Sequence, residues 1–481
     1  MTATTARAKF SNLNTILSET NLTLTQQEYL IDFTIRYNQK TQKSKNQARY
    51  NRQVLADNKS MVEFQLPFKE LYYPIVTQQS SGSKIQDIDG NEYIDLVMGY
   101  GVNLLGHNPP FIKAAILEQL DRGIQLGSQP QLIGEVANLI KELTGVARVA
   151  FSNTGTEAVM TAIRLARTVT GRNKIVIFSN SYHGHFDGTL GKAKMIDDRL
   201  QTTAIASGIP ANYLQDIIVL KYGDEQSLEV IKQHHQQLAA VLVEPVQSSR
   251  INLQPKAFLQ QLRQITKDSQ IALIFDEMVT GFRIHPGGAQ AWFEIEADIV
   301  TYGKIVGGGL PIGIIAGKAK YLDAIDGGMW NYGDLSSPLA KTTVFAGTHC
   351  KHPLAIASAK AILEHLKARG ANLQQELNER TSQFVDRLNS YFAAEELPID
   401  LTNFGSLFGP YGEEDFNEPS EAESELSLVF DFLYYHLLSK GVMLRGNGGF
   451  LATAHTEEDL NYIFQAVKDS ITELRQGAFL S

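Results

Sequence analysis

The stretch Asp298–Gly317, DIVTYGKIVGGGLPIGIIAG, contains two short apolar runs separated by one lysine and three consecutive glycines. Runs of this length, rich in Val and Ile and bounded by Gly or Pro, are typical of buried strands. A phosphate-binding P-loop also joins Gly-Lys to a strand end, but it requires a Ser or Thr where this chain has Ile305. Lys304 therefore needs another function.

Five further apolar runs of the same kind lie upstream, and stretches with helical periodicity separate them. They are VARVAF (146–151), KIVIF (174–178), DIIVL (216–220), AAVLV (239–243) and IALIF (271–275). Strands that alternate with helices indicate an α/β fold whose mainly parallel sheet is covered on both faces. Ligands of such sheets bind at the carboxyl ends of the strands, so the residues that follow each run are the candidate site.

The N-terminal part of the chain is rich in Gln, Asn, Thr and Lys and lacks glycine. Thr25-Gln-Gln-Glu28 matches a capping box, and Tyr29, Phe33 and Tyr37 then recur at helical spacing, which predicts one amphipathic helix. The basic stretch from Lys40 to Arg52 follows. We interpret it either as a solvated linker or as a docking arm for an acidic partner.

Two other regions flank the apolar runs. KIQDIDGNEYIDL (84–96) alternates around Asp89-Gly90, which predicts a hairpin. Beyond residue 352 the pattern is chiefly helical, with a last helix from about Glu457. The acidic stretch GEEDFNEPSEAESE (412–425) is expected to be a solvated loop.

Composition excludes several classes of protein. A net charge of -9 and a pI near 5.7 argue against a nucleic-acid-binding protein. Cys350 is the only cysteine, which fits a reducing compartment, and no secretory leader or membrane-spanning run is recognisable. We therefore expect a cytoplasmic protein with no membrane or nucleic-acid partner.

The first two candidate segments follow VARVAF and KIVIF. Ser152-Asn-Thr-Gly-Thr156 precedes a helix, and its backbone N–H groups suit a phosphate, although the same residues describe an ordinary helix N-cap. Tyr182, His183 and His185 follow the next run. Two histidines at this spacing suggest a metal, but no carboxylate or cysteine cluster accompanies them, so no metal is expected and a polar turn is the alternative.

Carboxylates follow the runs AAVLV and IALIF, at Glu244 and at Asp276-Glu277, and Lys304 follows DIVTYG. A buried carboxylate is costly unless it meets a cation or caps a helix. Together these strand ends supply a phosphate cradle, an aromatic face, a carboxylate and a lysine. Pyridoxal 5'-phosphate needs all four, because a lysine binds its aldehyde and a carboxylate keeps its ring nitrogen protonated.

Six motifs, in this order, resemble those of a known enzyme family: SNTGTEA (152–158), YHGHFDG (182–188), EPVQ (244–247), FDEMVTGFR (275–283), TYGKIVGGGLPIG (301–313) and FAGTHCKHPLA (345–355). The family is the class III, fold type I, pyridoxal-phosphate-dependent aminotransferases, and its glutamate-1-semialdehyde aminomutase branch is the most similar. The resemblance covers roughly residues 70–475.

A finer resemblance is carried by four other stretches: YNQKTQKSKNQARYNRQVLADN (37–58), GVNLLGHNPPFI (101–112), GFRIHPGGAQAWF (281–293) and DGGMWNYGD (326–334). These are similar to the aminotransferase domains of hybrid polyketide/non-ribosomal peptide synthases. This resemblance leaves open whether the chain is an excised domain or a free-standing enzyme.

The resemblance implies a domain organisation. Residues 131–350 would form the large cofactor-binding domain, with its mainly parallel sheet flanked by helices. Residues 66–130 and 351–481 would form a smaller α+β domain built from both chain ends. Residues 1–65 would be an N-terminal extension with one helix.

The resemblance also assigns site residues. Lys304 would form the Schiff base with the cofactor and move the proton between substrate and cofactor, while Asp276 would pair with the ring nitrogen. Tyr182 would stack on the ring. The remaining cofactor contacts would come from the phosphate-binding Thr154, Gly155 and Thr156, from Gln247 at the ring hydroxyl, from Glu244 and His183 beside the ring, and from Thr348.

In this pattern Thr348 reaches the phosphate in the neighbouring subunit, so a homodimer is expected. The acceptor would be a β-ketoacyl chain on an acyl carrier protein, and the donor glutamine or glutamate. Tyr100 and Asn103 are candidates for the acceptor pocket, and Arg445 for the donor carboxylate. Arg283 is interpreted as structural.

Three alternatives remain. A glutamate-1-semialdehyde aminomutase is one, although that branch has a Gly-Ser-Trp-Gly-like segment where this chain has Met98-Gly-Tyr100-Gly101. A general ω-aminotransferase acting on free amines is the second. The third, a non-catalytic cofactor-binding regulator, would need a partner module such as a helix-turn-helix, and none is recognisable.

Overall fold

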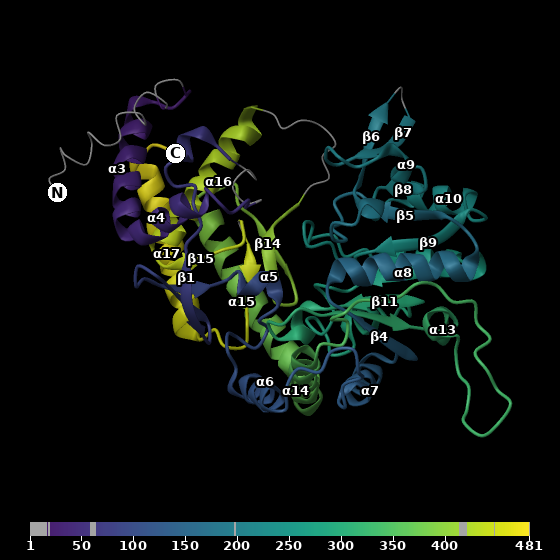
Figure 1. Cartoon of the computed structure of the whole chain (residues 1–481). Coiled ribbons are helices and arrows are strands. Elements are labelled where there is room, and N and C mark those ends of the chain that lie inside the picture. The colour runs from purple at the N-terminus through teal and green to yellow at the C-terminus, as the bar shows by residue number, and fades with distance from the viewer. Residues whose placement is uncertain are drawn as a thin grey trace. The chain divides into compact units, whose positions relative to one another are not determined.

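The computed structural model describes residues 17, 20–57, 64–196, 199–412, 421–446 and 448–480 (Figure 1). The chain divides into two compact units. The first falls within Met1–Met98, Leu105–Asn108 and Pro419–Ser481, and the second within Gly99–Leu104 and Pro109–Glu418. This division differs from the predicted one, because the helical region that starts at residue 351, expected in the small domain, falls in the second unit as far as residue 418.

A seven-stranded sheet forms the centre of the second unit, and each apolar run predicted as a strand contributes one. The strands are β4 (Arg148–Ser152), β5 (Lys174–Phe178), β8 (Ile217–Leu220), β9 (Leu238–Val243), β10 (Ala272–Asp276), β11 (Ile299–Tyr302) and β12 (Gly313–Gly317). Their order is β4-β12-β11-β10-β9-β5-β8. Only β12 runs antiparallel to its neighbours within this sheet, so the prediction of a mainly parallel sheet is confirmed.

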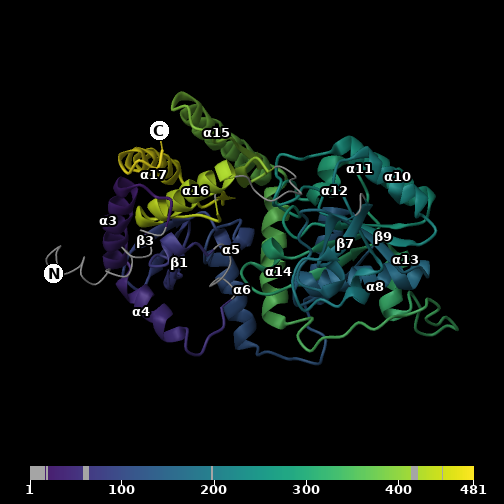
Figure 2. The same cartoon turned by 90° about the horizontal axis from the view of Figure 1, so that it is seen from above.

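Helices cover both faces of this sheet: Figure 2 shows α10 and α11 on one side and α8 and α13 on the other. Every residue of β9 and β10 is buried, as expected for strands covered on both faces. The other elements of the second unit are α6 (Pro110–Asp121), α7 (Ile133–Thr144), α8 (Gly155–Thr170), η3 (Asp187–Thr189), β6 (Gly191–Ile196), β7 (Arg199–Ala204), α9 (Ala211–Leu214), α10 (Glu225–Gln233), α11 (Lys256–Asp268), α12 (Gly288–Phe293), η4 (Lys304–Gly307), α13 (Ala319–Asp326), α14 (Pro353–Arg369), α15 (Asn372–Ala394), β13 (Leu401–Phe404) and β14 (Leu407–Pro410).

The first unit is built around a smaller sheet of order β1-β2-β3-β15. Its elements are α3 (Leu24–Lys40), α4 (Gln42–Asn51), η2 (Leu66–Phe68), β1 (Thr77–Ser81), β2 (Lys84–Asp87), β3 (Glu92–Asp95), α16 (Glu421–Ser439), β15 (Val442–Met443), β16 (Gly449–Phe450) and α17 (Glu457–Gln476). The hairpin β2–β3 confirms the turn predicted at Asp89-Gly90, where Gly90 has a φ of 93° that favours glycine.

The N-terminal helix α3 buries the face predicted for it, with Phe33 and Tyr37 each 2% exposed. Its capping box lies two residues earlier than predicted. The hydroxyl of Thr23 accepts the N–H of Gln26, and the side-chain oxygen of Gln26 accepts the N–H of Thr23 at 2.8 Å. The prediction of Thr25 as the cap was therefore wrong, because Thr25 already lies inside the helix.

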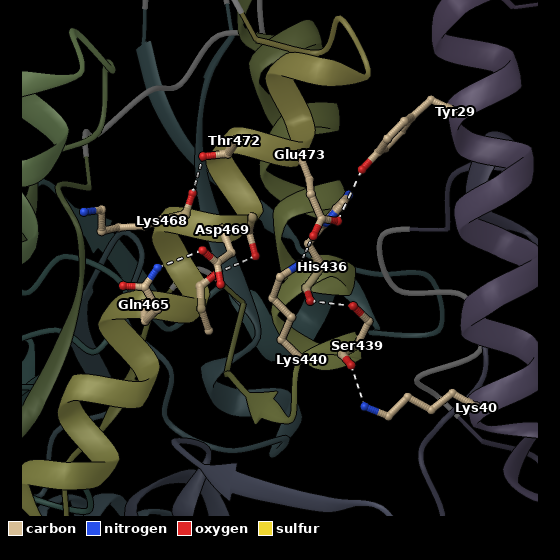
Figure 3. Close-up of polar contacts among 12 residues, drawn as sticks. Tyr29, Lys40, His436, Ser439, Lys440, Gln465, Lys468, Asp469, Thr472 and Glu473 are labelled. Carbon is tan, nitrogen blue, oxygen red and sulfur yellow. Dashed lines mark hydrogen bonds and ion pairs between the residues drawn. The ribbon is translucent and has the colours of Figure 1, made fainter.

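Contacts with α16 and α17 hold α3 in place (Figure 3). The hydroxyl of Tyr29 donates to Glu473 at 3.4 Å, and the ammonium of Lys40 donates to the carbonyl of Ser439 at 2.6 Å. The ring of Phe33 lies 4.4 Å from that of His436, which is fully buried. Helix α3 of the N-terminal extension is thus an integral part of the first unit.

The basic stretch after α3 forms a second helix, α4, rather than the linker considered above. Its first turn is anchored on the β2–β3 turn, since the N–H groups of Lys43 and Ser44 both donate to the carboxylate of Asp89. The ammonium of Lys45 contacts Glu70 at 2.6 Å. These polar contacts explain why the helix forms without an apolar face.

Two further expectations concern the acidic stretch and membrane-spanning helices. Most of the acidic stretch expected to be a loop, residues 413–420, lies outside the described residues, and α16 begins at Glu421. Within the described ranges, none of the helices combines the length and the apolar character needed to cross a membrane.

Candidate active site

The candidate site lies in the second unit, where β4, β5, β9, β10 and β11 end at the same edge of the sheet. Parallel strands bring their carboxyl ends together, so the segments predicted from the sequence converge here. Thr154 follows β4, His183 follows β5, Glu244 follows β9, Asp276 closes β10 and Lys304 follows β11.

Asp276 is buried, and its carboxylate contacts three polar groups. Its Oδ2 lies 2.8 Å from Nδ1 of His183, and its Oδ1 accepts the hydroxyl of Thr301 at 3.1 Å and the N–H of Met278 at 3.2 Å. Asp276 and His183 are 4% and 3% exposed. This arrangement fixes the orientation of the carboxylate.

Glu244 is a second buried carboxylate at the same edge. Burial raises its pKa to about 7; the imidazole of His183 lowers it, the charge of Asp276 raises it further, and the charge of Lys304 lowers it. The N–H of Ser248 donates to it at 3.2 Å. These electrostatic contacts place Glu244, His183, Asp276 and Lys304 in one polar cluster.

Lys304 begins the short helix η4 with a φ of 40°. A non-glycine residue in this left-handed region is strained, and such strain is concentrated at functional sites. The preceding Gly303 permits a close approach, because a Cβ there would lie 2.8 Å from Sδ of Met278 and 2.9 Å from the carbonyl of Ile312. The backbone around this lysine is therefore fixed by tight packing.

The helix α8 presents its N-terminus at this edge. Thr154 is the N-cap, whose hydroxyl accepts the N–H of Glu157 at 3.2 Å. Gly155 and Thr156 occupy the first two helical positions, whose N–H groups have no partner within a helix. A Cβ at Gly313 on β12 would overlap with the carbonyl of Thr154. This end of the helix suits an anion such as a phosphate.

Two buried polar atoms in the cluster have no partner among the described residues, namely Nε2 of His183 and Oε1 of Gln247. The amide nitrogen of Gln247 donates to the carbonyl of Ser179 at 2.7 Å and to the hydroxyl of Ser181 at 2.9 Å. Buried polar atoms without partners are rare in folded proteins. They fit a site that receives a polar ring, and Tyr182, 65% exposed, is available to stack on it.

Thr348 is exposed, and it follows a segment whose large apolar side chains also face solvent. Within that segment Leu335, Leu339 and Tyr332 are each at least 90% exposed. An apolar surface of this kind indicates a contact with another protein chain.

The predicted substrate residues fall in different places. Tyr100 and Asn103 lie in the second unit, where Tyr100 has a φ of 57° and is 47% exposed. Arg445 lies in the first unit, with its guanidinium 5.8 Å from the centre of the Phe450 ring. The roles of these three residues stay predictions.

Arg283 is structural, as interpreted from the sequence. It is 1% exposed and donates to the carbonyl of Val279, to the hydroxyl of Ser406 and to the carbonyl of Gly101. Burial lowers its pKa to about 9. These hydrogen bonds connect the loop after β10 to Gly101, the residue that follows Tyr100.

Sequence reasoning missed Thr301. This residue pairs with Asp276 in the register of β10 and β11, which brings its hydroxyl to the carboxylate. The register of two parallel strands cannot be read from one sequence, although a Thr in an otherwise apolar run was a signal. Among the described residues no group of His, Cys, Asp and Glu has the arrangement of a metal site.

Comparisons with known proteins agree with this geometry. Residues 68–457 match the protein-family model described as aminotransferase class-III. A glutamate-1-semialdehyde 2,1-aminomutase from Alkaliphilus oremlandii is 33% identical over 428 residues, 84% of this chain and 92% of that protein.

Two solved structures are also similar. One is an omega-transaminase from Sphaerobacter thermophilus, with a TM-score of 0.80 and 26% identity over 90% of this chain and 98% of that one. The other is a beta-phenylalanine aminotransferase from Variovorax paradoxus, with a TM-score of 0.76 and 27% identity over 94% of this chain and 98% of that one.

Proposed function

The chain belongs to the class III aminotransferases, and we propose that it transfers an amino group from glutamine or glutamate to a β-ketoacyl thioester on an acyl carrier protein. The product would be a β-aminoacyl thioester, as used in polyketide/peptide biosynthesis. At the coarser level the protein is a fold type I aminotransferase that depends on pyridoxal 5'-phosphate. The identity of donor and acceptor is the proposed part.

The polar cluster at the sheet edge carries the proposal of transamination. When bound, the cofactor supplies an aldehyde that an amine condenses with and a ring that withdraws electrons from the bond beside that amine. Lys304 would hold the cofactor covalently. Its amine, once displaced by the amino group of the donor, would be the base that takes the proton from the substrate and passes it to the cofactor.

Asp276 would keep a proton on the ring nitrogen. The contacts of its carboxylate with His183 and Thr301 leave little freedom to turn, so it is oriented before the cofactor binds. Preorganised charge of this kind is worth more in a buried site than in water. Gln247 and Tyr182 would contact the ring, and the N-terminus of α8 would bind the phosphate at Thr154, Gly155 and Thr156.

The exposed apolar segment before Thr348 supports a homodimer in which Thr348 of one subunit reaches the phosphate of the other. Without a partner, side chains such as Leu335 would face water. The site would then be completed by the second copy of the chain.

Three observations support a β-ketoacyl acceptor. The stretches of the N-terminal region and the Trp330 segment resemble synthase aminotransferase domains, and the structurally similar Variovorax enzyme is named for a β-amino acid. The turn Met98–Gly101 also departs from the aminomutase pattern, with left-handed backbone at both Met98 and Tyr100. Backbone strain of this kind clusters at functional sites.

A glutamate-1-semialdehyde aminomutase is the second candidate, favoured by the 33% identity to proteins of that name. An aminomutase moves the amino group within one molecule and needs no external donor. An ω-aminotransferase, as in the Sphaerobacter structure, would accept small free amines.

An assay that varies both the acceptor and the amino donor distinguishes these functions. The purified enzyme, loaded with cofactor, is given a β-ketoacyl carrier protein or glutamate-1-semialdehyde, each with and without glutamine or glutamate, and products are identified by mass spectrometry. We expect a β-aminoacyl product only with the carrier-bound acceptor and an amino-acid donor. Donor-independent 5-aminolevulinate would overturn the proposal in favour of the aminomutase.

A further inference from the structure

The end of α4 and the turn that follows it expose basic and apolar side chains together. We call this the α4 surface and define it as Arg49, Tyr50, Arg52, Val54 and Leu55. All five are exposed, with Tyr50, Val54 and Leu55 at 69%, 84% and 56%. Among the described residues, neither arginine has an acceptor or a carboxylate partner.

The backbone keeps these side chains close together. The N–H of Arg52 donates to the carbonyl of Ala48 at 3.0 Å, and the N–H of Leu55 donates to that of Asn51 at 2.7 Å. The chain from Arg49 to Leu55 therefore continues the turns of α4. Helix α4 lies at the margin of the first unit in Figure 2, beside α3.

The α4 surface is a local excess of positive charge on an acidic protein. Between Asp32 and Asp57 the chain has six basic side chains and no acidic one, although its net charge is -9. Three of the six are engaged within the unit: Lys40 with the carbonyl of Ser439, Lys43 with that of Ile88, and Lys45 with Glu70. Arg49 and Arg52 remain at the surface, so within the basic stretch Lys40–Arg52, interpreted above as a possible docking arm, they are the residues available to a partner.

We propose that the α4 surface docks the acidic carrier protein that delivers the thioester. The inference rests on the proposed function, because only a carrier-bound acceptor requires such a surface. Arginine binds carboxylates through two parallel hydrogen bonds, and exposed Tyr50, Val54 and Leu55 provide the apolar centre that protein interfaces need. Most of this acidic protein repels an acidic partner, so a local basic surface decides where the partner binds.

The test compares one substrate in two forms, the carrier-bound β-ketoacyl thioester and the same acyl group on pantetheine. Charge reversal in the double variant R49E/R52E is expected to raise KM for the carrier-bound form at least tenfold and to leave kcat unchanged. The pantetheine thioester should be turned over as by the unmodified enzyme. The variant R49K/R52K, which keeps the charge, should retain most of the carrier-bound activity.

The control is K113E/K267E, which changes the net charge equally at two exposed lysines on α6 and α11. It is expected to leave KM for the carrier near that of the unmodified enzyme. A carrier KM that is unchanged in R49E/R52E, or raised as much in the control, would overturn the docking inference alone. Failure of both thioesters with the unmodified enzyme would instead overturn the proposed function, and the inference with it.

Discussion

Lys304, Asp276 and His183 are the residues on which the proposed chemistry would depend, and the contact between Asp276 and His183 is the one whose geometry the structure defines. The carboxylate is 4% exposed and lies 2.8 Å from the imidazole. A buried charge of this kind is costly unless its partners remain in place. In the proposed site His183 would therefore be a positioning residue, which would act on the cofactor's ring nitrogen through Asp276.

The variant His183→Ala is expected to slow the donor half-reaction about tenfold to hundredfold, since a hydrogen bond to a charged group contributes roughly 1.5–3 kcal/mol. His183→Asn, whose side chain offers an N–H close to the position of Nδ1, should recover part of the rate. Single-turnover bleaching of the cofactor absorbance by the donor measures both. Equal rates for all three proteins would show that the contact is structural only.

At the scale of elements, the approach of β12 to the N-terminus of α8 fixes the predicted phosphate site. Gly313 lies against the carbonyl of Thr154. A Cβ added at Gly155 would lie only 2.9 Å from Sδ of Met278. A side chain at Gly313 would require movement of the cap, whereas one at Gly155 would require movement of the Met278 side chain. The predicted phosphate site thus depends on Gly313, a small residue that is not among its predicted contacts.

Gly313→Ala should weaken cofactor binding at least tenfold, because overpacking of about 1–3 kcal/mol would displace Thr154 and the first N–H groups of α8. The cofactor Kd, from titration of the apoenzyme, measures this. The matched control is Gly134→Ala on α7, where nothing lies within 4 Å of the added carbon and the backbone is helical. Equal Kd values for both variants would contradict this account of the site.

The contact of α3 with α16 and α17 provides a second prediction at this scale. The neighbouring His436 and the ammonium of Lys440 lower the pKa of Glu473 to about 2. Burial lowers the pKa of His436 itself, whose Nδ1 lies 3.3 Å from the carboxylate of Glu473. The ammonium of Lys440 lies 2.9 Å from that carboxylate, and the hydroxyl of Tyr29 donates a hydrogen bond to it.

Glu473→Gln should lower the free energy of unfolding by about 0.5–1 kcal/mol at pH 7, because the pair is partly exposed and screened. A carboxylate whose folded pKa is depressed stabilises above its unfolded pKa, here about 4.5, and loses that contribution as the pH falls toward 2. Denaturant midpoints of both proteins between pH 7 and pH 3 should therefore converge toward acid. A difference that stays constant with pH would show that Glu473 acts through packing.

The elements differ in how far the sequence predicts them. The seven apolar runs were sufficient to predict the strands of the large sheet, because Val- and Ile-rich runs bounded by turns form few structures other than buried strands. The direction of β12 was not predictable from composition; it is antiparallel because residues 303–312 are too few for a crossover helix. Helix α4 was missed because polar contacts with Asp89, distant in sequence, stabilise it in place of an apolar face.

The same limit applies to the site. The positions of Lys304, Asp276 and the predicted phosphate segment at strand ends could be predicted, since each closes or follows an apolar run. The partners of Arg283 were not, because the carbonyl of Gly101 lies 182 residues away in the sequence. Contacts of this kind depend on the fold and leave no local pattern.

At the scale of the whole molecule, the proposed dimer places Thr348 in the neighbour's site, which complementation can test. Thr348→Ala should weaken cofactor binding about tenfold, as expected for the loss of a hydrogen bond to a charged phosphate. Lys304→Ala should abolish turnover. A mixed dimer of the two variants would contain one site in which both residues are intact. Mixing the variants should therefore restore part of the activity, and this activity should show the cofactor affinity of the unmodified enzyme. Mixing without recovery would place Thr348 in its own subunit's site or outside the site.

The central claim is that the amino group passes between two molecules. Its most direct test is to incubate the enzyme, loaded with cofactor, with a β-ketoacyl carrier protein and glutamine or glutamate labelled with ¹⁵N at the α-amino group. The account predicts a β-aminoacyl product that is heavier by one mass unit and contains the donor's nitrogen. An unlabelled product, or product formed without any donor, would contradict it and show that the amino group moves within a single substrate.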